Sequence, residues 1–248
     1  MMEEMMKRWA REYNTPSFVD CDPIKFPRKY MERQDDAEIS GLLTALISFG
    51  RREQILKKAE DLDKMFDGNP FRWIAMGEFW DDIPYDNGIF YRTITNKKMI
   101  DWCIVIRKMI TEYSTIENFL IMNNVQCDGA HVILSYLMGF NTQSANKRIA
   151  MFLRWMVNDE GDVDLGLWKA RKWQKIPIPL DTHVHRMALE LGITKRKSVD
   201  RKTAMEITEY FEKVFPNNPL LGDFALFGYG VNHSKANDWQ ANEANDCD

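Results

Sequence analysis

Apolar residues recur three and four positions apart along most of the chain, whereas the alternation of period two that marks strands is scarce. One apolar stripe covers residues 39–47 and follows Asp35 and Asp36, which supply first-turn acids and a candidate N-cap. A second stripe covers residues 55–66 and ends at 67–70, where a glycine and a proline terminate the helix. The pattern therefore predicts an all-α protein.

The middle of the chain continues this helical pattern. Further helices are expected at 100–110, 116–121 and 132–138. A polar break at 141–144 then precedes another apolar stripe over 149–156, so a helix-loop-helix hairpin is predicted at about 130–157.

Residues 158–180 are less regular and contain two glycines and two prolines, so they are expected to form a long connector. Asp181 precedes a new apolar stripe, which places it at a helix N-terminus, and Gly192 is the expected residue after the end of that helix. Two more helices are expected at roughly 200–215 and 219–231.

Residues 1–235 are predicted to form one domain. The polar and acidic residues 236–248 are expected to be a frayed tail. At 248 residues the chain is long enough to bury a substantial core.

Composition limits the class of protein. A hydrophobic content of 45% and a charged content of 28% exclude disordered and collagen-like chains, and no apolar run is long enough to cross a bilayer. The N-terminus lacks the features of a signal peptide, so we expect a cytoplasmic protein. The four cysteines are scattered, which argues against a zinc site or an iron–sulfur cluster, and neither a metal nor another cofactor is expected.

The charge is unevenly distributed along the chain. The formal net charge is −4, but residues 141–202 hold 13 Lys and Arg against 7 Asp and Glu, a net charge of +6. A solvated helical surface is the commoner explanation of such a cluster, and a nucleic-acid-binding surface is the alternative.

The most informative motif is Leu-Asp-Thr-His at residues 180–183. It resembles the Val-Asp-Thr-His segment of the helix-hairpin-helix DNA glycosylases, the superfamily of endonuclease III and the 8-oxoguanine glycosylases, with Leu180 in place of the usual valine. Lys147-Arg148 and the segments 152–157 and 224–228 also resemble a bacterial family within that superfamily. The resemblance spans nearly the whole chain and implies a fold of two helical lobes with a cleft between them.

This resemblance implies that Asp181 is catalytic. A carboxylate beside the free N–H groups at a helix N-terminus is held ionised, and it can stabilise the positive charge that develops on the sugar when a glycosidic bond breaks. A plain N-cap is the alternative role for an isolated aspartate at such a position.

In bifunctional members a lysine on the second helix of the hairpin attacks the sugar and forms a Schiff base. Lys147 is the candidate here, and the adjacent Arg148 favours its neutral amine form. If Ala150 is aligned with the family's Lys-Thr-Ala pattern, however, Arg148 takes the nucleophile position, and arginine cannot act as an amine. Both residues are also candidates for contacts with DNA phosphate.

The hairpin loop departs from the family pattern because the usual Gly-hydrophobe-Gly turn is missing. Ser144 and Asn146 are therefore the expected phosphate contacts, together with Arg148 and His183. Lys147 and Asp181 are 34 positions apart, a separation more similar to that of the archaeal 8-oxoguanine branch.

The resemblance also implies residues that face the flipped base. Asp223 takes the position of a family glutamine and Phe227 that of a stacking phenylalanine. Phe224 and Phe227 can equally be ordinary core residues, since they lie three positions apart on a helix.

The sequence thus predicts a monomeric DNA base-excision-repair glycosylase, associated with the nucleoid and not with membranes. It would act on double-stranded DNA and remove a damaged base, with an 8-oxoguanine-like purine as the leading substrate and AP-lyase activity through Lys147. The alternative is a non-catalytic DNA- or RNA-binding protein that retains the same fold.

Overall fold

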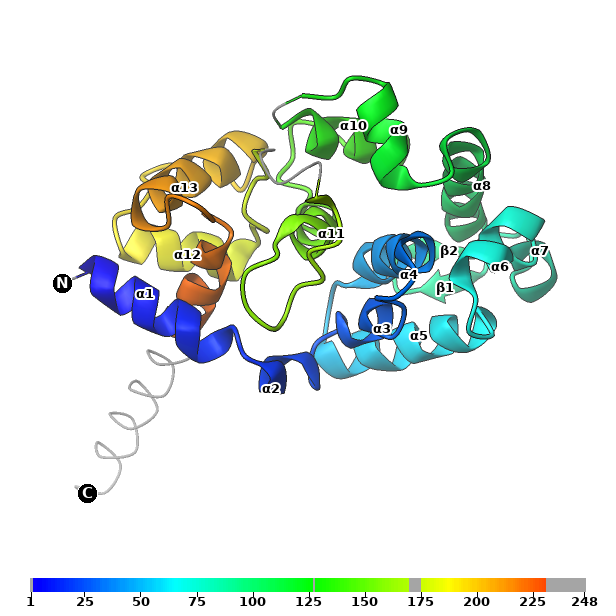
Figure 1. Ribbon diagram of the computed structural model, residues 1–248, viewed down its shortest axis with the longest axis horizontal. Helices are drawn as coiled ribbons and strands as arrows, with labels where there is room; N and C mark the ends of the chain where they lie inside the picture. Colours follow the sequence, from blue (N-terminus) through cyan, green and yellow to red (C-terminus); the bar gives the residue numbers. More distant parts are fainter. Residues whose placement is uncertain (1, 127, 170–174, 231–248) are drawn as a thin grey trace.

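The computed structural model describes residues 2–126, 128–169 and 175–230, most of which are helical (Figure 1). Within these ranges the only sheet is the antiparallel pair β1 (Ile89–Tyr91) and β2 (Ile94–Thr95). The all-α class is therefore confirmed. The predicted tail at 236–248 lies outside the described residues.

The helices of the first half of the chain are α1 (Met2–Tyr13), α2 (Pro16–Val19), α3 (Lys25–Arg28), α4 (Gln34–Ile47), α5 (Arg52–Met65), α6 (Pro70–Met76) and α7 (Phe79–Asp82). Those that follow are α8 (Asn96–Tyr113), α9 (Ile116–Met122), α10 (Gly129–Leu137), α11 (Lys147–Val157), α12 (Thr182–Glu190) and α13 (Arg201–Val214). A last described helix covers residues 221–230. Each apolar stripe named in the sequence analysis coincides with one of these helices and extends at most one residue past its end, whereas α1, α2, α3, α6, α7 and the β1–β2 hairpin were not predicted.

Helix α4 forms the centre of the core. Every residue from Asp36 to Ile47 is buried, and the helix packs against α11, α3, α5 and α6. Gly41 lets α11 approach closely, because a Cβ at this position would lie 2.6 Å from the terminal methyl of Met156. One continuous apolar cluster extends from this crossing through the described residues.

Figure 1 shows how the remaining helices are arranged about α4 and α11. Helices α5 to α8 lie on one side, and α1, α12 and α13 lie on the other. Helix α1 also packs against the last described helix, since the ring of Trp9 contacts that of Tyr229 and the ring of Tyr13 contacts that of Phe227. The beginning and the end of the described chain therefore meet in space.

A buried carboxyl group joins three parts of the fold. Glu38 of α4 is fully buried and accepts hydrogen bonds from the backbone N–H groups of Ile116 and Glu117, the side-chain amide of Gln34 and the indole of Trp168. Burial raises the pKa of Glu38 to about 7, although these hydrogen bonds lower it. Glu38 thus links α4, the start of α9 and the connector that follows α11.

None of the described helices combines the length and the apolar character that crossing a membrane requires.

Candidate active site at the start of two helices

Asp181 is the N-cap of α12, as the sequence predicted. Its backbone is extended, and its Oδ1 accepts hydrogen bonds from the backbone N–H groups of His183 and Val184 at 3.0 and 2.8 Å. Gly192 follows the end of the same helix with a φ of 69°, the left-handed conformation expected of a glycine there. The carboxylate is therefore fixed at the positive end of α12 with its second oxygen, Oδ2, directed elsewhere.

That second oxygen binds Lys147, the first residue of α11. The Nζ of Lys147 donates to Oδ2 of Asp181 at 2.5 Å, although the two residues are 34 positions apart in the chain. Their side chains keep 38% and 33% of their surface exposed, so the pair is reachable from solvent. The starts of two helices thus bring a cation and an anion together at a half-buried position.

The environment holds Asp181 in its ionised form. Burial alone would raise the pKa of Asp181. The charge and hydrogen bond of Lys147 lower this pKa, and so do the hydrogen bonds from the backbone N–H groups of Val184 and His183. Together they outweigh burial, so the pKa of Asp181 lies below its usual value. A carboxylate with a lowered pKa is a poor proton acceptor and a persistent negative charge.

Arg148 is directed away from this pair. Its guanidinium lies 4.5 Å from the ring centre of Phe140 and 4.9 Å from that of Phe49, and it donates to the backbone oxygen of Leu46 at the end of α4. Of the two adjacent cations, Lys147 is therefore the one whose side chain reaches Asp181.

The loop between α10 and α11 is fixed from two sides. Asn146 adopts a left-handed conformation with a φ of 41°, and its side-chain amide donates to the backbone oxygen of Asn141 and not to the start of α11. Ser144 forms a β-bridge with Asp200, and the N–H of Arg201 donates to the backbone oxygen of Gln143. The basic segment before α13 thus lies against the hairpin loop, a proximity that the sequence did not reveal.

The start of α11 presents backbone N–H groups. No described residue accepts a hydrogen bond from the N–H of Lys147 or of Arg148, because Asn146 does not cap the helix. Unpaired N–H groups at a helix N-terminus have the chemistry of a phosphate contact.

The two histidines of α12 have different surroundings. The ring of His183 lies against the backbone of Gly230 in the last described helix, and its Nδ1 is 3.4 Å from the guanidinium of Arg186. His185 is buried, with its Nε2 2.7 Å from the backbone oxygen of Arg196. Only His183 is partly accessible from solvent, and it lies two residues from Asp181.

Asp223 lies close to the Lys147–Asp181 pair but is itself held by a residue that the sequence analysis missed. Arg154 donates to the carboxylate of Asp223 and, at 3.2–3.3 Å, to that of Asp164. Burial raises the pKa of Asp223, while the charges of Arg154 and Lys147 lower it and that of Asp181 raises it. Arg154 follows Lys147 by seven residues, which is two helical turns, and this spacing was the available signal.

Phe227 is part of an aromatic cluster. Its ring makes edge contacts with Tyr13 and Phe18, both at 5.4 Å between ring centres, and Phe18 also contacts Phe224. Phe227 is half-buried against the N-terminal segment, so the packing role is the one that its contacts support.

Among the described residues there is no group of three or more His, Cys, Asp or Glu side chains that could hold a metal ion. The polar groups described at the site are the ion pair, the two helix N-termini and the network around Arg154.

The fold and the site together define a helical protein with a lysine–aspartate pair at the starts of two helices. The chain matches the family described as Protein of unknown function (DUF2400) over residues 22–232, and it belongs to that family. The matched range includes Lys147, Arg154, Asp181 and Asp223, and it begins after α1 and α2. No curated protein and no solved structure shows significant similarity to the chain.

Proposed function

We propose that this protein is a DNA glycosylase of the helix-hairpin-helix superfamily, with two helical lobes that enclose the damaged base. The observation that carries the proposal is the 2.5 Å contact between Lys147 Nζ and Asp181 Oδ2, from helices joined by a long connector. The resemblance of the Leu-Asp-Thr-His motif implies a catalytic role for Asp181, and the position of Lys147 on the second helix of the hairpin implies one for Lys147. The contact between the two side chains supports both roles.

In this proposal Asp181 stabilises the transition state electrostatically. Cleavage of the bond between base and sugar develops positive charge at C1′, and a fixed anion that is already ionised lowers the energy of that state. The two backbone hydrogen bonds to Oδ1 hold the carboxylate in place, so little reorganisation is needed during the reaction.

Lys147 is the proposed nucleophile of the AP-lyase step. The electron pair of its neutral Nζ forms a bond to C1′ while the bond between C1′ and the base breaks. The base leaves with the electron pair of that broken bond and takes up a proton. Opening of the sugar ring then breaks the bond between C1′ and O4′. O4′ keeps the electron pair of that bond and takes up a proton that Nζ gives up, and a protonated Schiff base remains. Hydrolysis by water at C1′ is the monofunctional variant of the same reaction.

The proposed DNA contacts surround this pair. The free N–H groups of Lys147 and Arg148 suit one phosphate, and Ser144, Asn146 and His183 lie on the same two helix starts. The basic loop that contacts Ser144 extends the positive surface. Asp223 is the proposed contact for hydrogen-bond donors on the flipped base, with an 8-oxoguanine-like purine as the leading substrate.

Single-turnover assays on a panel of lesion-containing duplexes test the proposal. Asp181→Asn keeps an N-cap acceptor but removes the charge, so we expect base release to fall by about 100-fold or more with DNA affinity largely kept. Glu60→Gln, which removes an exposed carboxylate on α5 outside the proposed site, is the matched control and should release base at a rate much closer to that of the wild type.

Borohydride reduction tests the covalent step separately. The wild type should form a trapped protein–DNA complex, and Lys147→Gln should not. Base release without trapping would establish a monofunctional enzyme, whereas a wild type inactive on every lesion would remove the enzymatic proposal.

A non-catalytic nucleic-acid-binding protein is the second candidate, and the salt bridge itself favours it. In the resting structure Lys147 donates to Asp181, so its amine is engaged as an ion-pair partner. This candidate predicts that Asp181→Asn and Lys147→Gln change neither DNA affinity nor the biological effect of the protein.

A further inference from the structure

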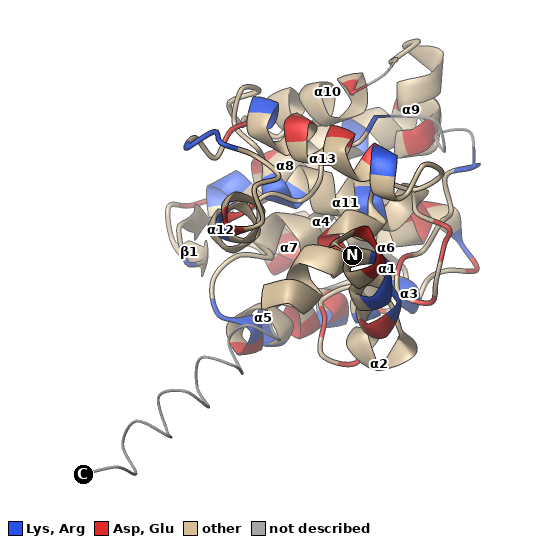
Figure 2. Ribbon diagram, turned by 90° about the vertical axis from the view of Figure 1, so that its left-hand side faces the viewer, with Lys and Arg blue, Asp and Glu red and all other residues tan. Residues whose placement is uncertain are grey.

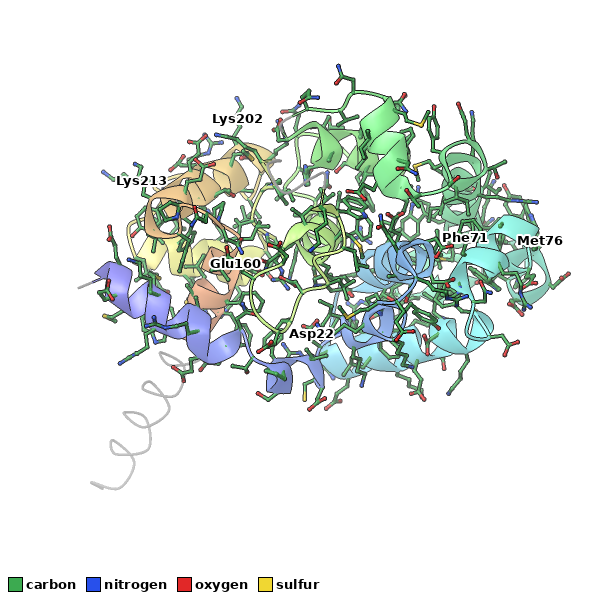
Figure 3. The ribbon with its side chains drawn as sticks, in the orientation of Figure 1. Asp22, Phe71, Met76, Glu160, Lys202 and Lys213 are labelled. Carbon is green, nitrogen blue, oxygen red and sulfur yellow. The ribbon has the colours of Figure 1, made fainter. Side chains whose placement is uncertain are left out.

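A cavity of about 500 Å³ lies away from the Lys147–Asp181 pair, between α1, the start of the connector and the turn after α13. None of the residues assigned to the proposed active site lines it. The lining residues are Lys7, Ala10, Arg11, Asn14, Glu160, Gly161, Val214, Phe215, Pro216, Asn217, Asn218 and Leu221. Figure 3 labels Glu160 beside the last helix and Lys213 at the outer edge of α13.

One face of α1 supplies the charged wall of this cavity. Lys7, Ala10, Arg11 and Asn14 are spaced three and four residues apart, so their side chains share that face. No described residue forms an ion pair with Arg11, and Lys7 contacts only the exposed Glu4 at 3.5 Å, which is a weak interaction in water. Two cations are therefore available to an anion.

The remaining walls are apolar or carry hydrogen-bonding groups, apart from the acidic residue Glu160, which the two cations outnumber. Ala10 and Val214 are buried, and Leu221 is half-buried, so they offer an apolar surface to the body of a ligand. The Oδ1 of Asn14 is buried and accepts no hydrogen bond from the described residues, which makes it a candidate acceptor for a ligand donor.

The polar wall is held by a chain of side-chain hydrogen bonds. Asn14 donates to the backbone oxygen of Glu160 at 3.1 Å, and the N–H of Glu160 donates to Oδ1 of Asn158 at 3.1 Å. Asn218 donates to the same oxygen at 2.6 Å, and Asn158 donates to Oδ2 of Asp164 at 2.6 Å. Because these groups fix one another, the cavity is organised before any ligand enters, which lowers the entropic cost of binding.

A neighbouring cavity differs from the cavity beside α1 in the cations that line it. It has a volume of about 520 Å³ and shares Glu160 and residues 216–218, but its single cation, Lys175, pairs with Glu212 at 3.5 Å. The combination of available cations and an apolar wall belongs to the cavity beside α1.

We propose that the cavity beside α1 binds a small organic anion, a phosphate or carboxylate attached to an apolar or aromatic body. The anionic group would pair with Lys7 and Arg11, the body would pack on Ala10, Val214 and Leu221, and a hydroxyl or amide of the ligand would donate to Asn14. The site is separate from the proposed glycosylase chemistry and does not depend on it.

Isothermal titration calorimetry with four probes tests the proposal on the full-length protein. Phenyl phosphate and benzoate combine an anion with an aromatic body, whereas inorganic phosphate lacks the body and benzyl alcohol lacks the charge. We expect phenyl phosphate, benzoate or both to bind about tenfold or more tightly than either incomplete probe. Which of the two binds better identifies the anionic group.

Charge-neutralising variants locate the binding. Lys7→Gln/Arg11→Gln should weaken binding of the better probe by about tenfold or more. Arg8→Gln/Lys213→Gln removes two nearby exposed cations that do not line the cavity, and it should bind as the wild type does. Equal affinity of the two double variants, or no binding of either complete probe to a folded wild type, would overturn the proposal. Neither outcome depends on whether the protein cleaves DNA.

Discussion

At the scale of a single residue, the buried carboxyl group of Glu38 links the protonation of one side chain to the stability of the fold. It accepts hydrogen bonds from four groups on α4, α9 and the connector, and Gln34 joins it to the carboxylate of Glu117. Burial raises its pKa to about 7, above the value near 4.5 that it has when exposed. A group whose pKa is higher in the folded state stabilises the fold at low pH, and this stabilisation is lost as the pH rises through that higher value.

Glu38 should therefore make the protein less stable as the pH rises from 5 to 8. The raised pKa of Glu38 corresponds to a loss of about 2–3 kcal/mol of unfolding free energy between pH 5 and pH 8. Urea unfolding of the wild type and of Glu38→Gln at both pH values measures it, because the difference between the two proteins should change by that amount. Glu32→Gln removes an exposed carboxylate and should leave the pH dependence nearly unaltered. If the difference in unfolding free energy between the wild type and Glu38→Gln does not change with pH, the pKa of Glu38 is not raised in the folded protein.

At the scale of elements, two glycines set how closely helices approach. A Cβ at Gly41 would lie too close only to the terminal methyl of Met156, at 2.6 Å, which can move aside; the ring of Phe152, at 3.5 Å, would be in ordinary van der Waals contact. A Cβ at Gly222 would lie 2.3 Å from the ring of Phe211, which is fully buried in α13 and packed against Tyr210 and Phe215. The contact between α13 and the last described helix is therefore the less tolerant of the two.

Gly222→Ala should destabilise the protein by about 1–3 kcal/mol, because the aromatic ring must shift within a packed core. Gly41→Ala should remain within about 1 kcal/mol of the wild type, since the gain in helix propensity offsets a small movement of Met156. Chemical unfolding of the two variants compares them directly. If Gly41→Ala is destabilised more than Gly222→Ala, our conclusion that the contact at Gly222 is the tighter of the two is wrong.

At the scale of the whole molecule, charge is segregated by the fold as well as by the sequence. Figure 2 shows Lys and Arg near α12, while Asp and Glu alternate with them over α1 and α13. The basic loop before α13 contacts the hairpin loop through Ser144 and Asp200, so the positive segment borders the Lys147–Asp181 pair. The net charge of −4 thus does not describe the surface proposed to meet DNA.

DNA affinity should depend on this basic loop. Lys195→Gln/Lys197→Gln removes two exposed cations of this loop, and we expect weaker binding to any duplex and a salt dependence whose logarithmic slope falls by about 2. Fluorescence anisotropy over a range of salt concentrations measures both quantities. Lys57→Gln/Lys108→Gln, on α5 and α8, is the matched control. Identical slopes for the two double variants would place the DNA-binding surface elsewhere.

The sequence by itself determined the helical class, the hairpin and the N-cap role of Asp181. These follow from local rules, because apolar spacing, glycine and proline breaks and a capping carboxylate act within a few residues of one another. Short helices such as α6 and α7 and the β1–β2 hairpin were missed, since so few residues carry little periodic signal.

Only the tertiary structure decided which side chains meet. The 2.5 Å contact between Lys147 and Asp181, the packing of Arg148 between Phe49 and Phe140, and the burial of Arg154 all join segments distant in the chain. Local spacing cannot choose between adjacent cations such as Lys147 and Arg148. Long-range packing turns one toward the carboxylate and buries the other against aromatic rings, because each must satisfy its charge within the volume that the folded core leaves.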